Sequence, residues 1–267
     1  MDRSDSTNYS QVFEGFGWHV QEIDGHDHEK IREAIEKAQV VDRPSLIIGN
    51  TIMAKGAANV EGDHETHGAP LDPEEIKATK EKLGLPQEQF YLPNEVVEHF
   101  QSRFKTLTDS CQQWKSQIDS ASQDNDFDVA WKCVHQTTYP ELEYPTFDAG
   151  TKLATRKAFG ATLDKFADQI PNLIGGSADL EPSNYTGNFA TKFGDFSKTN
   201  RTGRNLAFGV REFPMAAAMN GIALHGGLIP FGGTFLVFAD YERPALRLGS
   251  IQKCRVMHEF THDSFWV

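Results

Sequence analysis

Glu212 is a carboxylate at the start of an otherwise apolar segment, an unusual place for an ionisable side chain. In FGVREFPMAAAMNGIALHGG, residues 208–227, Arg211 and Glu212 come before a run of small and apolar residues whose pattern resembles a helix buried on all sides. A carboxyl group that enters apolar surroundings loses hydration, which favours its neutral form. Such a group can hold or transfer a proton near neutral pH. An ion pair with Arg211, or a contact with the helix N-terminus, explains the pattern equally well.

Aromatic residues recur at a fixed interval further along the chain. The sequence TFLVFADY places Phe235, Phe238 and Tyr241 three residues apart, so that on a helix they share one face. Core packing is the commoner reason for such a row. The alternative is an aromatic wall for a flat ring, and the spacing alone leaves both open.

A glycine-rich turn follows the apolar run IPNLI. The turn GGSADLEPSN, residues 175–184, is expected at the carboxyl end of a strand, where glycine lets the backbone approach a ligand. It matches neither the dinucleotide-binding nor the P-loop pattern. A tight structural turn explains it about as well.

Two histidines lie in the segment HETHGAP. His64 and His67 are three residues apart, one residue closer than in the zinc motif HExxH. A zinc site needs further ligands, and no Cys or His cluster supplies them. The spacing therefore favours a solvated loop.

The elements that must position these residues fall into two α/β series. In the first, strands at GWHVQEI and RPSLIIGNTI flank a helix at 27–39 that Asp27 caps. A glycine-rich loop, 54–72, precedes a helix at 72–84 with Asp72 as its cap and Pro73 in its first turn. Alternating strands and helices predict parallel sheets with helices on their faces.

The second series starts near residue 151. Residues 94–122 are predicted to be helical, and 123–150 carry the acids and prolines of an interdomain linker. An amphipathic helix at 151–169 then precedes a strand in IPNLIGGSADL. Strands are further predicted in NLAFGV, in the apolar part of 228–251, which ends in a helix, and in KCRVMHEFTHDSFWV.

Composition narrows the class of protein. The 267 residues carry a net charge of -12, which argues against nucleic-acid or anionic-membrane partners. No apolar run reaches transmembrane length, and MDRSDSTNYSQ lacks a signal core, so we expect a cytoplasmic protein. The three cysteines have no CxxC spacing, and we expect reduced thiols.

Several motifs in one order carry a family resemblance. HGAPL, ATRK, IGGSADLEPSN, GRNLAFGVREF, MNGIALHGG, GGTFLVFADY and THDS closely resemble the transketolase family of thiamine-diphosphate enzymes. The likeness runs over most of the chain and is most specific from residue 151 onward. It implies parts of two thiamine-diphosphate-binding-type domains. Residues 1–100 correspond to the C-terminal part of the diphosphate-binding domain, 101–150 to a linker, and 151–267 to the N-terminal part of the pyrimidine-binding domain.

The resemblance gives Glu212 a role in catalysis. Its counterpart faces the aminopyrimidine ring of thiamine diphosphate and shares a proton with it, which promotes the ylide that attacks the substrate. The family transfers a two-carbon ketol group from a ketose phosphate to an aldose phosphate in the pentose phosphate pathway. Its site lies between two subunits, which implies a homodimer. REFPM departs from the commoner REHAM-like form at Phe213 and Pro214, but proline is tolerated in a first helical turn.

Other positions match the family one by one. The resemblance assigns Phe235, Phe238 and Tyr241 to the pyrimidine pocket, and Asp179 to an acid near the cofactor across the interface. Arg156 and Ser183 match groups that hold the sugar phosphate. His262 matches a histidine of the substrate channel. His67, rather than His64, matches the loop histidine near the diphosphate and the reacting carbon.

The family's metal-binding signature, which begins with GDG, does not occur in this sequence. We therefore expect the ligands of Mg²⁺ or Ca²⁺ to lie outside this chain, which resembles a central piece of the family. The chain would then act with a second copy or with complementary transketolase chains. Two alternatives remain: a non-catalytic, partner-dependent subunit or inactive remnant, and a related thiamine-dependent synthase.

Overall fold

The computed structural model describes residues 4–136 and 141–263, and its chain divides into two compact units, Met1–Phe104 and Lys105–Val267. Both units combine helices with parallel strands, so the predicted α/β class is confirmed. Residues 264–267, the end of the segment KCRVMHEFTHDSFWV in which we predicted the last strand, lie outside the described residues.

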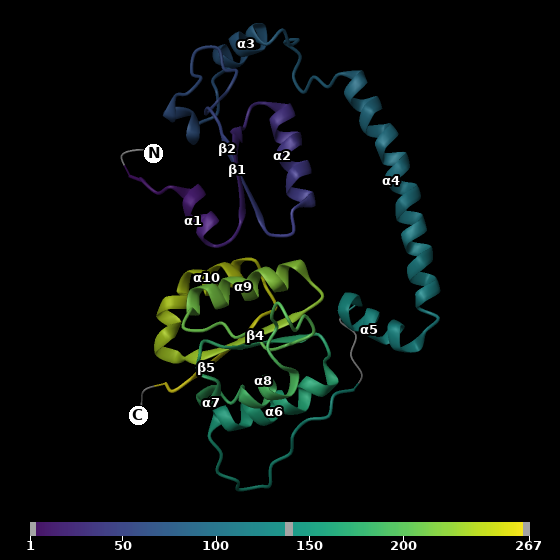
Figure 1. The fold of residues 1–267 in the computed structure, drawn as a ribbon, viewed down its shortest axis with the longest axis vertical. Helices are drawn as coiled ribbons and strands as arrows, with labels where there is room; N and C mark the ends of the chain where they lie inside the picture. The colour runs from purple at the N-terminus through teal and green to yellow at the C-terminus, as the bar shows by residue number, and fades with distance from the viewer. Residues whose placement is uncertain (1–3, 137–140, 264–267) are drawn as a thin grey trace. The chain divides into compact units, whose positions relative to one another are not determined.

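The first unit is built around two parallel strands, β1 (His19–Asp24) and β2 (Ser45–Asn50). The helix α2 (His28–Val40) connects them and lies beside them (Figure 1). Asp27 caps α2 as predicted, because its carboxylate accepts hydrogen bonds from the N–H groups of Glu29 and Lys30. The unit also contains α1 (Tyr9–Gly15), the 3₁₀ helix η1 (His64–His67) and α3 (Pro73–Lys82).

The loop 54–72 is more ordered than its composition predicts. Glu61 accepts hydrogen bonds from Lys55 Nζ at 2.8 Å and Gly56 N at 3.0 Å, and the bond from Lys55 lowers the pKa of Glu61 to about 2. The buried Glu75 of α3 binds both the backbone and the side-chain nitrogen of Asn59, at 2.9 and 2.8 Å. These bonds hold the loop against α3, although the loop contains only the short helix η1.

Two further helices occupy the region predicted as helix and linker. α4 (Asn94–Ala121) has no buried residue along its length. α5 (Asn125–Gln136) lies within the predicted linker, so that segment is not wholly extended. The rings of Trp114 and Trp131 join α4 to α5 with centroids 6.0 Å apart.

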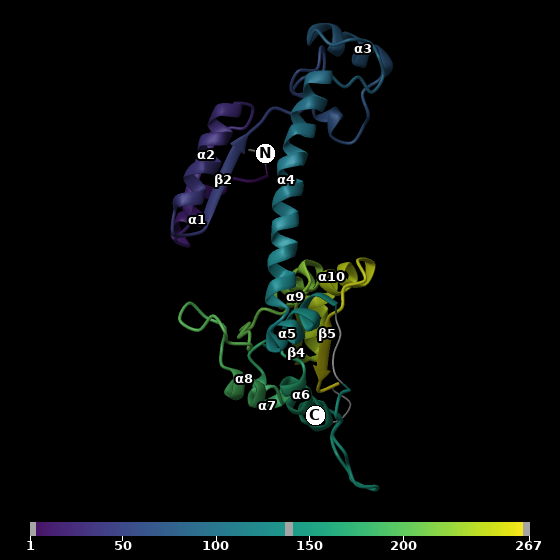
Figure 2. The same cartoon turned by 90° about the vertical axis from the view of Figure 1, so that its right-hand side faces the viewer.

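The second unit contains a three-stranded parallel sheet in the order β3–β4–β5. Its strands are β3 (Leu173–Ser177), β4 (Ile229–Phe235) and β5 (Met257–Thr261). Helices α9 (Glu212–His225) and α10 (Ala239–Ile251) cover one face (Figures 1 and 2). The other face carries α6 (Thr155–Gln169), α7 (Glu181–Asn184) and α8 (Gly187–Phe193).

Two adjacent glycines in β4 allow helices to approach the sheet from both faces. A Cβ atom at Gly232 would lie 2.6 Å from the sulfur of Met219 in α9. A Cβ atom at Gly233 would lie 3.1 Å from Cβ of Asn184 in α7 and 2.9 Å from an oxygen of Glu259. The glycine pair therefore sets the depth at which both helical layers pack.

Arg204 links several elements of the second unit beside the sheet. Its guanidinium donates to three carbonyl oxygens, those of Leu173, Ala167 and Ile170, at 2.8 to 2.9 Å. Its carbon Cζ also lies 4.0 Å from the ring centre of Phe193. The end of α6, the start of β3 and the aromatic side of α8 are thereby joined through one side chain.

The predicted strand NLAFGV is wrong. Only Asn205 forms β-bridges, to Gly175 and Asp195. The chain then turns at Gly209, whose φ of 67° belongs to the left-handed region that favours glycine. The segment thus pairs with Gly175 of β3 through a single bridge and enters α9 without forming a strand.

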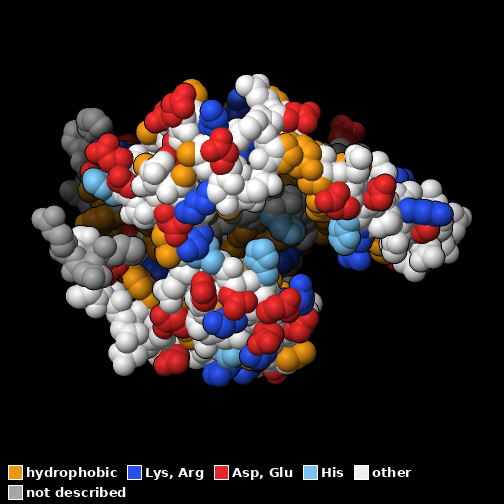
Figure 3. Space-filling model, turned by 90° about the horizontal axis from the view of Figure 1, so that it is seen from above, with side chains coloured by type: hydrophobic (Ala, Val, Ile, Leu, Met, Phe, Trp, Pro, Cys, Tyr) orange, Lys and Arg blue, Asp and Glu red, His pale blue; other side chains and the backbone are white. Residues whose placement is uncertain are grey.

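The surface is acidic and mixed. In the face shown in Figure 3, carboxylate side chains lie among basic ones. In the part of the chain that the structure describes, no helix combines the length and apolar character needed to cross a membrane. Within the described residues, Cys111, Cys133 and Cys254 form no disulfide.

Candidate functional site

Most of the predicted site residues in the second unit lie where the parallel strands end. Asp179 follows β3, Phe235 ends β4, and His262 follows β5. Because parallel strands place their carboxyl ends at the same edge of a sheet, residues distant in sequence meet there.

A cavity of about 430 Å³ at this edge contains four of the predicted residues. Two carboxylates, Asp179 and Glu212, and two aromatic rings, Phe238 and Tyr241, line it. The remaining lining residues are apolar: Ala178, Leu180 and Val210. This combination suits a flat, partly polar ring that stacks on aromatic groups and exchanges hydrogen bonds with a carboxyl group.

Glu212 is the first residue of α9 and is only 8% exposed. Arg211 instead donates to the carbonyl oxygen of Phe208 at 3.1 Å. Within the described ranges 4–136 and 141–263, Glu212 forms no ion pair with Arg211, which removes that explanation of the sequence pattern. Its place in the first turn puts it near the positive end of the helix dipole while its side chain lines the cavity.

The aromatic row forms, but not on one helix face as the spacing predicted. Phe235 ends β4, Phe238 ends a 3₁₀ turn, η2 (Leu236–Phe238), and Tyr241 lies in α10. Phe235 and Phe238 stack at 5.7 Å with an interplanar angle of 10°, and Phe238 lies 6.1 Å from Tyr241. The strand-to-helix junction therefore aligns three rings that come from three different elements.

A second cavity of about 340 Å³ contains Arg156 and His262. Arg156 Nη1 lies 3.1 Å from His262 Nε2 and donates to the carbonyl oxygen of Ser183 at 3.3 Å. The guanidinium also lies 5.5 Å from the ring centre of Tyr185. A positioned guanidinium beside a histidine suits an anionic oxygen group such as a phosphate.

Phe235 contacts a residue of each cavity, Phe238 of the first and His262 of the second. Besides stacking on Phe238, its ring lies 4.2 Å from the ring of His262. The backbone near both cavities is also unusual, since Asp179, Tyr185 and His262 have φ angles of 64°, 56° and 52°. Left-handed conformations of non-glycine residues persist where the surrounding structure enforces them, which is common at functional sites.

His67 lies in the first unit, at the exposed end of η1. Within the second unit, the predicted residues gather at the two cavities described above. The first unit has a cavity of its own, of about 370 Å³, at the carboxyl ends of β1 and β2. Its lining residues are Asp24, His26, Asn50, Thr51, Ile52 and Lys55.

Three polar residues near the second cavity, of which two are buried and Glu259 is partly buried, were not predicted from the sequence. Asn184 is fully buried and Thr261 is 6% exposed. Burial of Glu259 raises the pKa of its carboxyl group to about 8. Asn184 and Thr261 directly adjoin the predicted residues Ser183 and His262 in sequence, and that adjacency was the one available signal.

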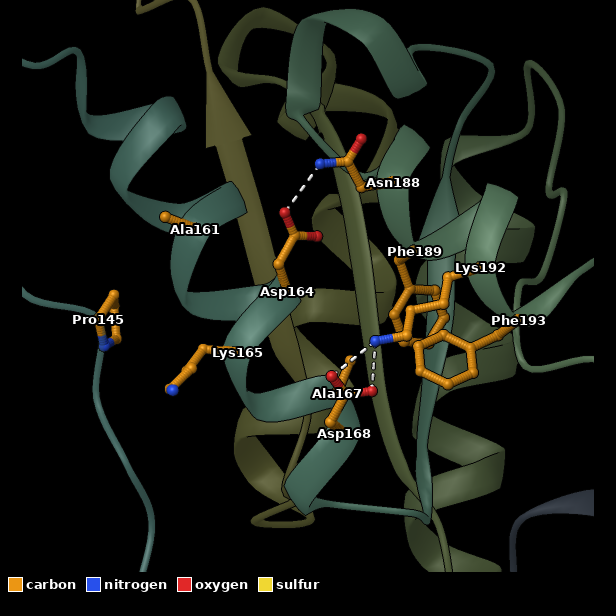
Figure 4. A pocket seen from close by; sticks show the side chains of 10 residues that line it. All are labelled: Pro145, Ala161, Asp164, Lys165, Ala167, Asp168, Asn188, Phe189, Lys192 and Phe193. Carbon is orange, nitrogen blue, oxygen red and sulfur yellow. Dashed lines mark hydrogen bonds and ion pairs between the residues drawn. The ribbon is translucent and has the colours of Figure 1, made fainter.

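A larger cavity, of about 570 Å³, lies between α6 and α8 (Figure 4). Lys192 pairs with Asp168 at 2.5 Å, and Asn188 donates to Asp164 at 2.8 Å, as the dashed lines in Figure 4 indicate. None of the predicted site residues lines this cavity. Lys165, the remaining charged residue drawn in Figure 4, pairs with Glu143 at 2.8 Å, so we assign this cavity no ligand.

Comparisons with known proteins match two stretches of the chain. The family model described as "Transketolase, thiamine diphosphate binding domain" matches residues 1–131, and "Transketolase, pyrimidine binding domain" matches residues 151–267. Transketolase of Bacillus subtilis is 42% identical over 289 residues, covering 100% of this chain and 41% of the relative. That of Geobacillus stearothermophilus is 40% identical over 275 residues, with the same two coverages.

Solved structures agree with the sequence comparisons. Transketolase from Campylobacter jejuni gives a TM-score of 0.88 at 36% identity, covering 98% of this chain and 40% of that one. A Pichia stipitis transketolase described as a complex with sedoheptulose 7-phosphate gives 0.90 at 32% identity, covering 98% and 41%. The chain thus spans about two fifths of the length of the relatives that it matches.

Proposed function

Because the chain belongs to the transketolase family, we propose that it contributes to the transfer of a two-carbon ketol group from a ketose phosphate to an aldose phosphate. The observation that carries this proposal is the first cavity, where Glu212 and Asp179 meet the rings of Phe238 and Tyr241. The second cavity, with Arg156 and His262, lies at the same edge of the sheet and supports it.

The residues of the first cavity fit the pyrimidine ring of thiamine diphosphate. Phe238 and Tyr241 offer faces on which a flat ring stacks, and Glu212 offers a nearly buried carboxyl group. When bound, the cofactor supplies the carbon nucleophile of the reaction. The part of Glu212 is to hold or move a proton at a ring nitrogen, and Asp179 adds a second carboxylate to the cavity wall.

The second cavity is suited to the phosphate of a sugar phosphate. Arg156 provides a fork of N–H donors, and its position is fixed by His262 and the Ser183 carbonyl. In this proposal Ser183 and His262 complete the phosphate site and border the path of the substrate. His67 acts on the diphosphate side, and the ligands of Mg²⁺ or Ca²⁺ come from outside this chain.

The outer face of α9 is the basis for a proposed partner. Met215 and Met219 are fully buried, whereas Phe213 and Leu224 on the same helix are 47% and 57% exposed. The neighbouring Val210 is 73% exposed. Large apolar side chains exposed along one helix are typical of an interaction surface. A second copy of the chain, or a complementary transketolase chain, would cover this face.

A cytoplasmic location remains a prediction.

The test is to replace the matching segment of Bacillus subtilis transketolase with this chain and to measure ketol transfer between sugar phosphates. We expect the chimaeric enzyme to form products with thiamine diphosphate and Mg²⁺. A folded, dimeric chimaera without transfer activity would contradict the proposal and favour the non-catalytic alternative. Products other than sugar phosphates would favour the thiamine-dependent synthase instead.

Calorimetry of the unmodified chain addresses its partner dependence. Without ligands for the metal, the diphosphate loses most of its electrostatic binding, so we expect no tight binding of thiamine diphosphate with Mg²⁺. Saturation at micromolar cofactor would mean that the metal site is misplaced in this proposal.

A further inference from the structure

A hydrogen-bonded series of three buried polar side chains lies beneath the second cavity. It begins at Ser177, at the end of β3, and continues through Asn184 of α7 to Thr261, at the end of β5. Ser177 and Asn184 are fully buried, and Thr261 is 6% exposed. Buried polar groups are costly unless they are hydrogen-bonded, so the partners of these three define how they are arranged.

The bonds of Asn184 fix the orientation of its amide group. Nδ2 lies 3.3 Å from the carbonyl oxygen of Thr234, which can only accept, so this atom is the amide nitrogen. The same nitrogen lies 2.8 Å from Thr261 Oγ1. On the other side, Ser177 Oγ donates to Oδ1 at 2.8 Å while it accepts from the N–H of Leu180. Asn184 therefore presents an N–H donor to the hydroxyl of Thr261.

His262 stands between Thr261 and Arg156. Its Nδ1 lies 2.9 Å from Thr261 Oγ1, and its Nε2 lies 3.1 Å from Arg156 Nη1. A guanidinium has donors and no acceptor, so Nε2 must accept. The proton of the neutral ring is then on Nδ1, from which it is donated to the hydroxyl oxygen of Thr261.

We propose that Asn184 and Thr261 are positioning residues that hold His262 as the Nδ1–H tautomer, so that its Nε2 anchors the Arg156 guanidinium at the second cavity. Thr261 provides the acceptor for Nδ1–H, and Asn184 fixes the rotation of the Thr261 hydroxyl group. Both bonds of Arg156 to His262 and Ser183 use Nη1, which leaves Nη2 and Nε for an anionic ligand. The assignment of that ligand as a phosphate monoester rests on the proposed function.

The experiment measures the tautomer directly, on the whole chain and without ligand. Nitrogen-15 NMR of the histidine rings distinguishes a protonated Nδ1 from a protonated Nε2, and the spectrum of His262→Asn assigns the signals. We expect His262 to be mainly Nδ1–H in the wild-type chain. A mainly Nε2–H ring in the wild-type chain would overturn the inference, whatever the variants do.

A matched pair of variants tests the role of the hydroxyl group. Thr261→Val keeps the shape but removes the acceptor, whereas Thr261→Ser retains it. We expect the valine variant to move His262 toward the Nε2–H form and to weaken binding of inorganic phosphate roughly five-fold, the value of one net hydrogen bond. The serine variant should retain the wild-type tautomer and affinity. An unchanged tautomer in the folded valine variant would contradict a positioning role for Thr261.

The experiment tests the tautomer of His262 and the identity of the ligand independently. If His262 is Nδ1–H and responds to Thr261→Val, but the wild-type chain does not bind phosphate, the positioning role stands and the phosphate assignment of the proposed function is wrong. Titration with sulfate as a second oxyanion separates a preference for phosphate from general binding of anions.

Discussion

In the first unit, β1 and β2 contain no buried residue over their described length, whereas β3 and β4 of the second unit are buried along most of theirs. Parallel sheets are normally covered on both faces. The second unit meets this rule with helical layers on both sides, and the first has a single two-stranded ribbon with one long helix beside it. A two-stranded sheet is marginally stable by itself.

The same contrast applies to the candidate site. His67 of the first unit is exposed on a loop, while Glu212 and Thr261 of the second unit are buried against a packed sheet. The proposed role of Glu212 in proton transfer requires precise placement by locked neighbours, which the packed sheet of the second unit offers. The second unit therefore has the geometry for chemistry within this chain, and we expect the first to depend on further contacts.

The largest expected effect concerns Glu212. In the chimaeric enzyme, Glu212→Gln should lower turnover roughly 10²–10⁴-fold, because the amide keeps the size of the carboxyl group but cannot exchange its proton. Cofactor affinity should change much less, since Phe238 and Tyr241 remain. Exchange of the cofactor C2 proton for deuterium, measured beside turnover, tests the step itself. Glu141→Gln, an exposed carboxyl outside both cavities, is the matched control.

Phe238→Ala should have the opposite profile, with a loss of cofactor affinity before a loss of turnover at saturation. If Glu212→Gln exchanged the C2 proton at the wild-type rate, the carboxyl group would have only a structural role at the start of α9.

The next effect concerns the stability of the second unit. Arg204→Ala removes three hydrogen bonds to carbonyl oxygens and a contact with the ring of Phe193. We expect a loss of roughly 2–4 kcal/mol in its free energy of unfolding. Hydrogen–deuterium exchange should accelerate in β3, β4 and α6 and remain unchanged in β1 and β2. Arg255→Ala, at an exposed position, serves as the control. Equal acceleration in both units would mean that they unfold together.

Residue patterns predicted local elements better than they predicted contacts across the sheet. Asp27 and Asp72 cap their helices as expected, because a cap depends on neighbours within three residues. The segment NLAFGV has the residues of a strand but makes only bridges, since Gly209 redirects it toward α9. The tertiary context, rather than the β propensity of its residues, determines the conformation of that segment.

Four residues that the family resemblance named, Asp179, Glu212, Phe238 and Tyr241, line one cavity, but their arrangement did not follow from the sequence. The family resemblance indicated Glu212 and the aromatic residues, while the three-residue spacing suggested one helix face where the structure has three elements. The bond between Asn184 and Thr261 joins residues 77 positions apart. Spacing rules concern residues that are close in sequence, so they cannot predict this bond unless the order of the strands in the sheet is already known.

Glu259 gives the second unit a pH dependence that the first should lack. Burial raises the pKa of its carboxyl group to about 8 from the ordinary 4.5. Within the described part of the chain, neither carboxylate oxygen of Glu259 has a hydrogen-bond partner. Between these two pH values the unfolded chain ionises Glu259 while the folded chain keeps it protonated. The unfolded state therefore binds fewer protons, and stability falls as the pH rises.

We expect a loss of roughly 1–3 kcal/mol for the second unit between pH 5 and pH 8, less than the full shift implies because this partly buried carboxyl group is screened by solvent. Denaturant unfolding at several pH values, with hydrogen exchange to separate the units, measures it. Glu259→Gln should remove this part of the pH dependence. A slope that persists in Glu259→Gln would assign it to other groups.

The smallest effect belongs to the first unit and tests whether its stability is separate. Asp72 accepts a hydrogen bond from Glu75 N at 2.8 Å and caps α3, whose residue Glu75 in turn holds the loop that contains His67. Asp72→Ala should cost about 1 kcal/mol, the usual value of an N-cap, because one N–H group of the first turn loses its acceptor. Asp72→Asn retains an acceptor oxygen and should lose less than Asp72→Ala does. Since α3 and the loop 54–72 share the bonds of Glu75, we expect faster hydrogen exchange in both segments and no change in β3–β5. If exchange in β3–β5 accelerated as well, the two units would share one cooperative transition, and the contrast between a loosely packed first unit and a rigid second one would not describe the protein in solution.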